Sequence, residues 1–301
     1  MVKNDTPTAR SRITELSNLQ FAVVLTLPVI IFLVTMIIYP LGYSIWVSVH
    51  KVSFFGGYRA TFVGLDNYFH ALQSPNFWNG VILSLRFTIE SVILTILIGL
   101  GIALTLSRDF RGKAFVRVLA ILPWAVSAYA AGVMFKYLWR GRMGILTAIS
   151  YALGFETVIS PLDAAPMEML AVGNAWILAP LVAFFLLASI ETIPSRLYHL
   201  AEIDHLNSFQ KFTYVTLPYL RYTLFVFTSI VAVLSLKVFD YIFVQTGGGP
   251  GISTSTLTYE IYKESFKNLN LGYGAALSFY LLLIILVFTL LLFVIWGRKE
   301  I

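Results

Sequence analysis

The sequence contains no cysteine among its 301 residues. This absence excludes disulfides, thiolate metal sites and cysteine nucleophiles. Charge is also scarce, because only 12% of the residues are Asp, Glu, Lys or Arg, against about a quarter in an average soluble domain. Hydrophobic residues make up 58% of the chain. The composition therefore excludes a disordered protein and an ordinary soluble one.

The apolar residues gather in six stretches, each long enough to cross a hydrocarbon layer of ~30 Å as a helix. The stretches are Phe21–Val49, Phe87–Leu106, Ala114–Phe135, Met167–Ile190, Tyr222–Val244 and Tyr273–Trp296. They predict an all-α integral membrane protein with a six-span transmembrane domain over residues 21–296. The first stretch is too long for the core of a signal peptide, and no Ala-x-Ala cleavage site follows it, so we interpret it as an anchor that stays in the membrane.

Lysine and arginine are denser in residues 1–20, 107–113, 191–221 and 297–301 than in residues 50–86, 136–166 and 245–272. Segments rich in these residues stay on the cytoplasmic side of a membrane. The bias predicts a cytoplasmic N-terminal segment (1–20), a cytoplasmic tail (297–301) and a multi-pass location in the cell membrane.

The segment between the fourth and fifth stretches, residues 191–221, is much longer than a simple connection requires. Apolar residues recur in it at three- and four-residue spacing, and Pro194 and Pro218 bracket it as helix breakers. It predicts two short amphipathic helices that need a protein partner. The alternative is a pair of helices lying flat on lipid headgroups. Such helices usually carry Lys or Arg on the polar face, whereas this segment carries Glu202 and Asp204, and only Lys211 is basic between them and Pro218, which favours a partner.

Enzymatic and cofactor motifs are absent from the sequence. It has no Gly-x-x-x-x-Gly-Lys-Ser/Thr loop for ATP and no Gly-x-Ser-x-Gly nucleophile elbow. Gly247, Gly248 and Gly249 end at Pro250 and predict a turn rather than a phosphate cradle. His199 and His205 are six residues apart, which does not suit a metal site on one helical face. We therefore expect no enzyme activity, no metal and no cofactor bound by this chain.

Polar residues within the apolar stretches are the candidates for a solute path. Lys237 and Asp240 are three apart, so on a continuous helix they share a face and can neutralise one another, although Lys237 could instead reach the outer headgroups. Asn174 with Trp176 forms a polar-aromatic pair suited to a sugar ring, and the alternative is a tryptophan of the interfacial belt. Tyr241 completes this candidate set.

The 191–221 segment resembles the cytoplasmic "EAA loop" of permease subunits in binding-protein-dependent ABC importers. Their pattern is Glu-Ala-Ala, two residues, Asp-Gly-Ala, an aromatic spacer and then Ile-x-Leu-Pro. Here His199-Leu200-Ala201 occupies the first triplet and Asp204-His205-Leu206 the second, followed by Phe209, Phe212 and Leu217-Pro218. His199 replaces the usual Glu and His205 the usual Gly. Since that glycine permits a sharp turn, the replacement leaves the loop geometry as the feature to check.

Other segments resemble the carbohydrate-uptake branch of that family, which includes maltose and glycerol-phosphate permeases. They are Phe62–Tyr68, Leu122-Pro123, Trp176 with Pro180, Phe239-Asp240, Thr246–Pro250 and Gly272–Ser278. The resemblance implies a type I ABC importer permease fold. It also implies a second, different permease subunit, two ATPase subunits that use ATP and Mg, and an external solute-binding protein that delivers a sugar.

The resemblance further implies that the 191–221 segment couples the spans to the ATPase subunits. The ATPase-coupling residues would be His199, Leu200, Ala201, Glu202, Asp204, His205, Phe209 and Phe212, with the two phenylalanines as apolar anchors. Glycerol phosphate or another small polar solute is an alternative to a sugar. A secondary carrier would show inverted repeats, and a polytopic membrane enzyme would show clustered carboxylates or histidines. Neither pattern is found, and nothing indicates a nucleic-acid partner.

Overall fold

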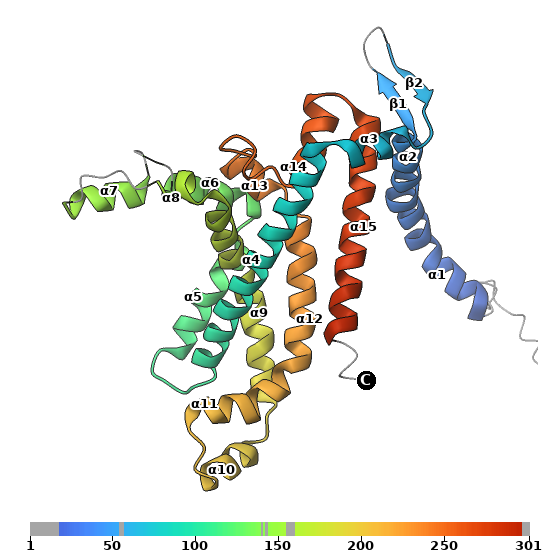
Figure 1. Ribbon diagram of the computed structural model, residues 1–301. Coiled ribbons are helices and arrows are strands. Elements are labelled where there is room, and N and C mark those ends of the chain that lie inside the picture. The colour runs from blue at the N-terminus through green and yellow to red at the C-terminus, as the bar shows by residue number, and fades with distance from the viewer. Residues whose placement is uncertain (1–17, 54–56, 140, 142–143, 155–159, 297–301) are drawn as a thin grey trace, which may run out of the picture.

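The computed structural model describes residues 18–53, 57–139, 141, 144–154 and 160–296, and helices dominate it (Figure 1). Five described helices are long and apolar enough to cross a membrane: Gln20–Ser48, Pro75–Leu106, Pro166–Glu191, Ser208–Leu236 and Leu271–Ile295. A bent pair, Lys113–Ala125 and Ala128–Trp139, makes a sixth span if it is counted as one. The predicted helical membrane architecture is confirmed. The predicted end segments, residues 1–20 and 297–301, lie outside the described residues apart from residues 18–20.

The core lies between α4 (Pro75–Leu106), α9 (Pro166–Glu191) and α12 (Leu217–Leu236), with α5 (Lys113–Ala125) alongside. Membrane helices lack a hydrophobic drive to associate, so close backbone approach through small residues matters. Gly99 of α4 illustrates this, because a Cβ at that position would lie 2.9 Å from the Cβ of Val182 on α9. Leu170, Val182 and Leu186 of α9 are fully buried in this core.

The first and last spans lie at the periphery. α1 (Asn18–Leu33), a π-helical turn (Val34–Ile38) and α2 (Tyr39–Ser48) form the first, and α15 (Leu271–Trp296) forms the last. The most apolar windows of both spans are unburied within the chain. Figure 1 shows α1 leaning away from the bundle, while α2 packs against α15. These apolar surfaces require lipid or another subunit around them.

A strand pair and a short helix close the outer end of these two spans. β1 (His50–Ser53) pairs antiparallel with β2 (Arg59–Phe62), and α3 (Asp66–Gln73) follows. Asn67 donates a hydrogen bond of 2.8 Å from Nδ2 to the Ser48 carbonyl, and the Tyr68 hydroxyl donates one of 2.8 Å to Ser48 Oγ. The Phe62–Tyr68 segment therefore ties the end of α2 to α3.

The two ends of the bundle carry different elements (Figure 1). One end carries α6 (Ala128–Trp139), α7 (Ile145–Ala152), α8 (Pro161–Ala164), α13 (Asp240–Gln245), α14 (Leu257–Tyr262) and a π-helical turn (Lys263–Lys267). The opposite end carries α10 (Ser195–Ile203), α11 (Ser208–Lys211) and the carboxyl end of α15. We use "outer" for the first and "inner" for the second, following the predicted orientation.

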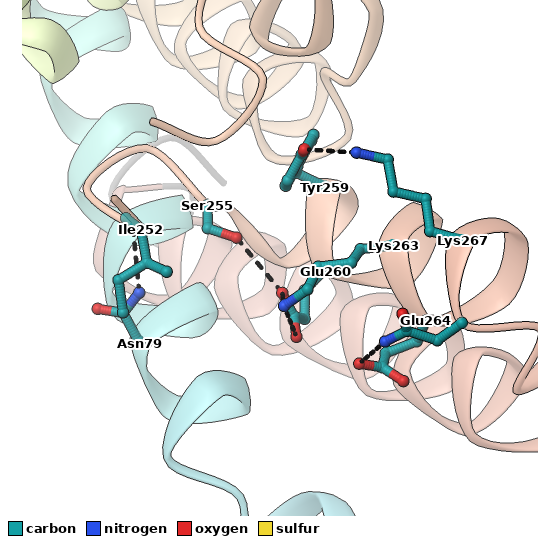
Figure 2. A network of polar contacts seen from close by, with 9 residues as sticks. Asn79, Ile252, Ser255, Tyr259, Glu260, Lys263, Glu264 and Lys267 are labelled. Carbon is teal, nitrogen blue, oxygen red and sulfur yellow. Dashed lines mark hydrogen bonds and ion pairs between the residues drawn. The ribbon is translucent and has the colours of Figure 1, made fainter. Parts of the chain in front are cut away.

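Ion pairs and hydrogen bonds hold the outer cap together (Figure 2). Glu260 is 3% exposed, accepts a hydrogen bond from Ser255 Oγ at 3.4 Å and pairs with Lys263 Nζ at 3.3 Å. Lys267 Nζ donates to the Tyr259 hydroxyl at 3.2 Å. Because a buried carboxylate needs such partners, this network fixes α14 and the turn that follows it.

The prediction of a continuous third span is wrong. α5 ends at Ala125, α6 begins at Ala128, and the two helices meet at 100°. Val126 is extended (φ −83°, ψ 131°), and Ser127 Oγ accepts a hydrogen bond of 3.3 Å from Ala130 N, which caps the start of α6. A cap of this kind supplies a partner for an otherwise free N–H group and so stabilises the break.

The fifth span also ends earlier than predicted. α12 ends at Leu236, so Lys237 and Asp240 lie on either side of a helix break and not on one helical face. Both are exposed, and no ion pair joins them among the described residues. Thr258 of α14 donates a hydrogen bond of 2.8 Å to the Val238 carbonyl, which satisfies a backbone group freed by the break.

The second span is longer than predicted. α4 starts at Pro75 rather than near Phe87, and Pro75 supplies a favourable first helical residue. Phe77, which the sequence places outside the membrane span, is 2% exposed and packs with Tyr273 and Leu277. The extra turns are covered by α14 and the loop before it, where Leu257 N donates to Ser84 Oγ, as well as by α15 at Phe77, and hydropathy alone does not show that.

Candidate functional site

The segment between α9 and α12 folds into two short helices joined by a sharp turn, which we name the inner hairpin (residues 195–211). Extended Pro194 starts α10, and the helix ends in a Schellman motif, in which His205 N donates to the Glu202 carbonyl at 3.0 Å and Leu206 N to the Ala201 carbonyl at 2.9 Å. His205 has φ 55°, so the turn persists without the usual glycine. The sharp turn between the two short helices, which the replacement of glycine by His205 left in question, is therefore present.

A capping box starts the second helix of the hairpin. Asn207 Oδ1 accepts from Gln210 N, and Gln210 Oε1 accepts from Asn207 N, both at 2.9 Å. A cap of this kind stabilises a helix by roughly 1 kcal/mol. The Asn-x-x-Gln spacing from Asn207 to Gln210 is the sequence signal for this cap.

The hairpin is joined to the membrane span without a flexible link. α11 continues through a π-helical turn (Phe212–Thr216) into α12, so Ser208–Leu236 is one helix of 29 residues. The prediction that Pro218 breaks this segment is wrong, because Pro218 lies in the first turn of α12, just after the wider π turn. A displacement of α11 is therefore carried directly into α12.

Large apolar side chains of the inner hairpin are exposed. Phe209 is 74% exposed and Ile203 72% exposed, and Leu200 is also exposed. Ala201 is buried, and Phe212 is half-buried against a cavity of about 610 Å³ between the hairpin and the inner ends of α4 and α9. Of the predicted coupling residues, Leu200 and Phe209 are therefore available to a partner, while Ala201 and Phe212 face this chain. Ile203 is also exposed, although it is not among the predicted coupling residues.

The acidic residues of the hairpin also differ in their contacts: one is paired within the hairpin and the other is exposed. Glu202 pairs with Lys211 Nζ at 3.0 Å and lies 3.8 Å from His199 Nδ1, so it joins the two short helices. The hydrogen bond from Lys211 and its positive charge lower the pKa of the Glu202 carboxyl. Asp204 is exposed and makes no ion pair with a described residue. Asp204 is therefore the free acidic group of the hairpin.

The five predicted solute-path residues do not form one cluster. Asn174 is 4% exposed and donates a hydrogen bond of 3.1 Å to Ser235 Oγ, which joins α9 to α12. Trp176 packs edge-to-face on Phe135 at 5.4 Å. Tyr241 is fully buried, whereas Lys237 and Asp240 are exposed at the outer end.

Buried hydroxyl groups line one face of α4, which the sequence analysis missed. They are Ser84, Thr88, Ser91 and Thr95, spaced by three or four residues. Ser91 Oγ and Thr95 Oγ1 make no hydrogen bond with a described residue. Their helical spacing was readable in the sequence, but single hydroxyls in an apolar stretch carry little weight when read one at a time.

Ion pairs tie α4 to α9 near the outer end. Arg86 pairs with Glu90 at 2.7 Å along α4 and with Glu168 on α9. At the inner end, Arg117 of α5 pairs with Glu191 of α9 at 3.5 Å. These charged side chains of the spans are therefore neutralised in pairs, as ionisable residues within membrane helices generally are.

A bundle of apolar helices, buried hydroxyls between them and an exposed hairpin joined to one span by a continuous helix define a multi-pass membrane protein. Residues 95–298 match the family model described as "Binding-protein-dependent transport system inner membrane component", and the chain belongs to this family. It is the permease subunit of a binding-protein-dependent ABC importer, not an enzyme, and it resides in the cell membrane.

Several curated relatives match along most of their length. The sulfoquinovosyl glycerol transport system permease SmoG of Agrobacterium fabrum is 31% identical over 89% of this chain and 87% of its own. The trehalose/maltose transport system permease MalF of Thermococcus litoralis is 31% identical, covering 88% and 89%. The sn-glycerol-3-phosphate transport system permease UgpA of A. fabrum is 33% identical, covering 88% and 90%.

Solved structures show the same fold. A bacterial ABC transporter for import of the acidic polysaccharide alginate matches with a TM-score of 0.79 and 19% identity, over 92% of this chain and 95% of that one. A bacterial alginate ABC transporter in complex with an alginate pentasaccharide-bound periplasmic protein matches with a TM-score of 0.77 and 19% identity, over 90% of this chain and 92% of that one. The predicted importer permease fold is thereby confirmed.

Proposed function

We propose that this permease imports a neutral sugar. Relatives named for trehalose, maltose and sulfoquinovosyl glycerol support a carbohydrate. The chain's own interior supports a neutral one, because its buried polar side chains are hydroxyls and amides apart from Glu260 of the outer cap, which pairs with Lys263, and none of the described Lys or Arg residues is buried. Hydroxyl and amide groups suit the hydroxyls of a sugar, whereas a phosphate needs cationic partners.

Glycerol phosphate is the second candidate, because UgpA of A. fabrum is 33% identical. Uptake by the complete transporter, reconstituted in vesicles, separates the two. We expect labelled neutral sugars to be accumulated and to compete with one another, while glycerol phosphate neither accumulates nor competes. Accumulation of glycerol phosphate alone would contradict the sugar assignment.

The importer requires subunits beyond this chain. We infer a second, different permease subunit, two ATPase subunits that bind ATP and Mg, and a solute-binding protein at the outer end. The unburied apolar surfaces of the first and last spans support a second membrane subunit. The dependence of the family on a binding protein supports the outer partner.

The inner hairpin couples the ATPase subunits to the spans. The observation that carries this proposal is the continuous helix Ser208–Leu236, which has the 74% exposed Phe209 at its inner end. Phe209, Ile203 and Leu200 supply the apolar contact with the ATPase, and Asp204 supplies a charge at its edge. When the ATPase dimer closes on ATP, α11 moves with it, and α12 follows because no loop separates them.

Reversing the charge of Glu202 is expected to reduce uptake. In Glu202→Lys, two ammonium groups face each other where Lys211 now pairs with a carboxylate at 3.0 Å, and their repulsion weakens the contact between α10 and α11. Glu202→Gln is the matched control, and it should keep most of the uptake because this exposed pair contributes little by itself. Uptake and chain insertion are measured for both variants. Normal uptake by Glu202→Lys would contradict the role of the pair.

A further inference from the structure

A small cavity of about 250 Å³ lies at the outer end of the chain, and neither Asn174 nor Ser235 lines it. Three segments build it: Lys136 from α6, Asp163 from α8, and Gln245 with the turn after α13. Its remaining lining is Leu162, Thr246, Gly249 and Pro250. Nothing in the coupling mechanism uses these residues.

Gln245 is the feature that points to a ligand. Gln245 is one of the residues that line the cavity and is 2% exposed, and neither Oε1 nor Nε2 has a hydrogen-bond partner of ordinary geometry among the described residues. Its amide approaches the Tyr241 hydroxyl one turn earlier, and that hydroxyl is also unsatisfied. A buried amide without partners costs about 1–3 kcal/mol, so an amide held in this position indicates a missing partner.

The other polar groups of the cavity are positioned to bind as well. Lys136 Nζ donates one hydrogen bond of 2.9 Å, to the Val244 carbonyl, which leaves two N–H groups. Asp163 accepts from Ser160 Oγ and retains further acceptor sites. One cation, one anion and one amide around an apolar floor of Leu162 and Pro250 match a neutral molecule that carries several hydroxyls. A lone anion would be repelled by the Asp163 carboxylate.

The wall of the cavity is held in place without a ligand. Thr254 Oγ1 donates to the Gly249 carbonyl and contacts Thr246 Oγ1, each at 2.8 Å. The same loop is tied to α4, where Asn79 donates to the Ile252 carbonyl at 3.4 Å (Figure 2). The cavity is therefore largely formed in advance, as binding sites for small molecules generally are.

We propose that this cavity is an outer subsite for the transported sugar, which binds sugar hydroxyls through Gln245, Lys136 and Asp163 before the sugar enters the bundle. That the ligand is a sugar rests on the proposed function of the transporter. The proposal adds a specific place, at the end of the molecule where a binding protein delivers solute.

Gln245→Leu tests the subsite, because leucine keeps a similar volume and removes both polar groups. In vesicles that contain the complete transporter, we expect the sugar concentration that half-saturates uptake to rise about tenfold, the effect of one lost hydrogen-bonded contact of about 1.4 kcal/mol. Lys136→Met removes the ammonium group of the half-buried Lys136 and should shift the half-saturating concentration in the same direction. Asn79→Ala, which loosens the same loop without lining the cavity, should leave it unchanged.

The outcomes separate this proposal from the sugar assignment. If the wild type accumulates only phosphorylated solutes, a neutral sugar is neither the substrate of the transporter nor the ligand of the cavity. If the wild type accumulates a neutral sugar and both Gln245→Leu and Lys136→Met keep the wild-type half-saturating concentration, the subsite alone is wrong and the cavity holds water. An equal rise of the half-saturating concentration in Asn79→Ala would also overturn the subsite, because loosening the loop that contains Ile252 would then be enough to cause it.

Discussion

Phe209→Ala is expected to reduce sugar uptake to background while the chain still inserts in the membrane. Phe209 is 74% exposed at the start of the helix that becomes α12, so the substitution removes little from the folded chain itself. An aromatic side chain buried at an interface contributes about 1.5–3 kcal/mol, which corresponds to roughly 10- to 150-fold in affinity. Losing it should detach the ATPase from the lever that moves α12.

Phe266→Ala is the matched control for this prediction. Phe266 is 68% exposed, but it lies at the opposite end of the bundle, after α14. Uptake, ATPase activity and the amount of co-purified ATPase subunit are measured for both variants. Only Phe209→Ala should lose the ATPase, and a complete complex with normal uptake in that variant would contradict the docking role.

Gly272→Ala is expected to prevent the outer end of the chain from folding. A Cβ at Gly272 would overlap the carbonyl oxygen of His50, which is backbone and cannot rotate away. The same carbonyl accepts a hydrogen bond of 3.2 Å from Asn67, so displacing it also disturbs α3. Overpacking of this kind costs about 1–3 kcal/mol or more. We expect a clear loss of folded protein in detergent and a lower melting temperature.

Two further glycines supply the controls. Gly101 has no atom near its missing Cβ, so Gly101→Ala should be neutral or stabilise the helix by up to about 1 kcal/mol. A Cβ at Gly274 would meet the Ser265 hydroxyl, so Ser265→Ala should partly rescue Gly274→Ala. No side-chain change should rescue Gly272→Ala in this way. If Gly272→Ala proved as stable as the wild type, α15 would not pack this closely on β1.

Hydropathy located the spans well, because lipid requires long apolar helices wherever the chain crosses it. It could not locate their breaks. The end of α12 at Leu236 depends on Thr258, which reaches the Val238 carbonyl from α14, and the early start of α4 depends on burial of Phe77 beneath α15. Such contacts join residues far apart in sequence, so a local pattern does not contain them.

The inner hairpin was predictable in outline but not in its internal contacts. The resemblance placed a turn at His205, and the Schellman motif confirms it. The pairing of Glu202 with Lys211 could not be predicted, because it depends on how the turn folds α11 back on α10. The outer cavity was also beyond sequence reasoning, since Lys136, Asp163 and Gln245 come from three separate segments.

The absence of cysteine allows the central claim to be tested directly, because one introduced thiol is the only one in the chain. Ile203→Cys places it at a 72% exposed position of the inner hairpin, and Phe266→Cys places it at the outer end. Each variant, in the assembled transporter, is labelled with a photoreactive maleimide and irradiated. We predict that Ile203→Cys becomes covalently linked to an ATPase subunit and Phe266→Cys does not. An active transporter in which Ile203→Cys is linked only to lipid would contradict the account.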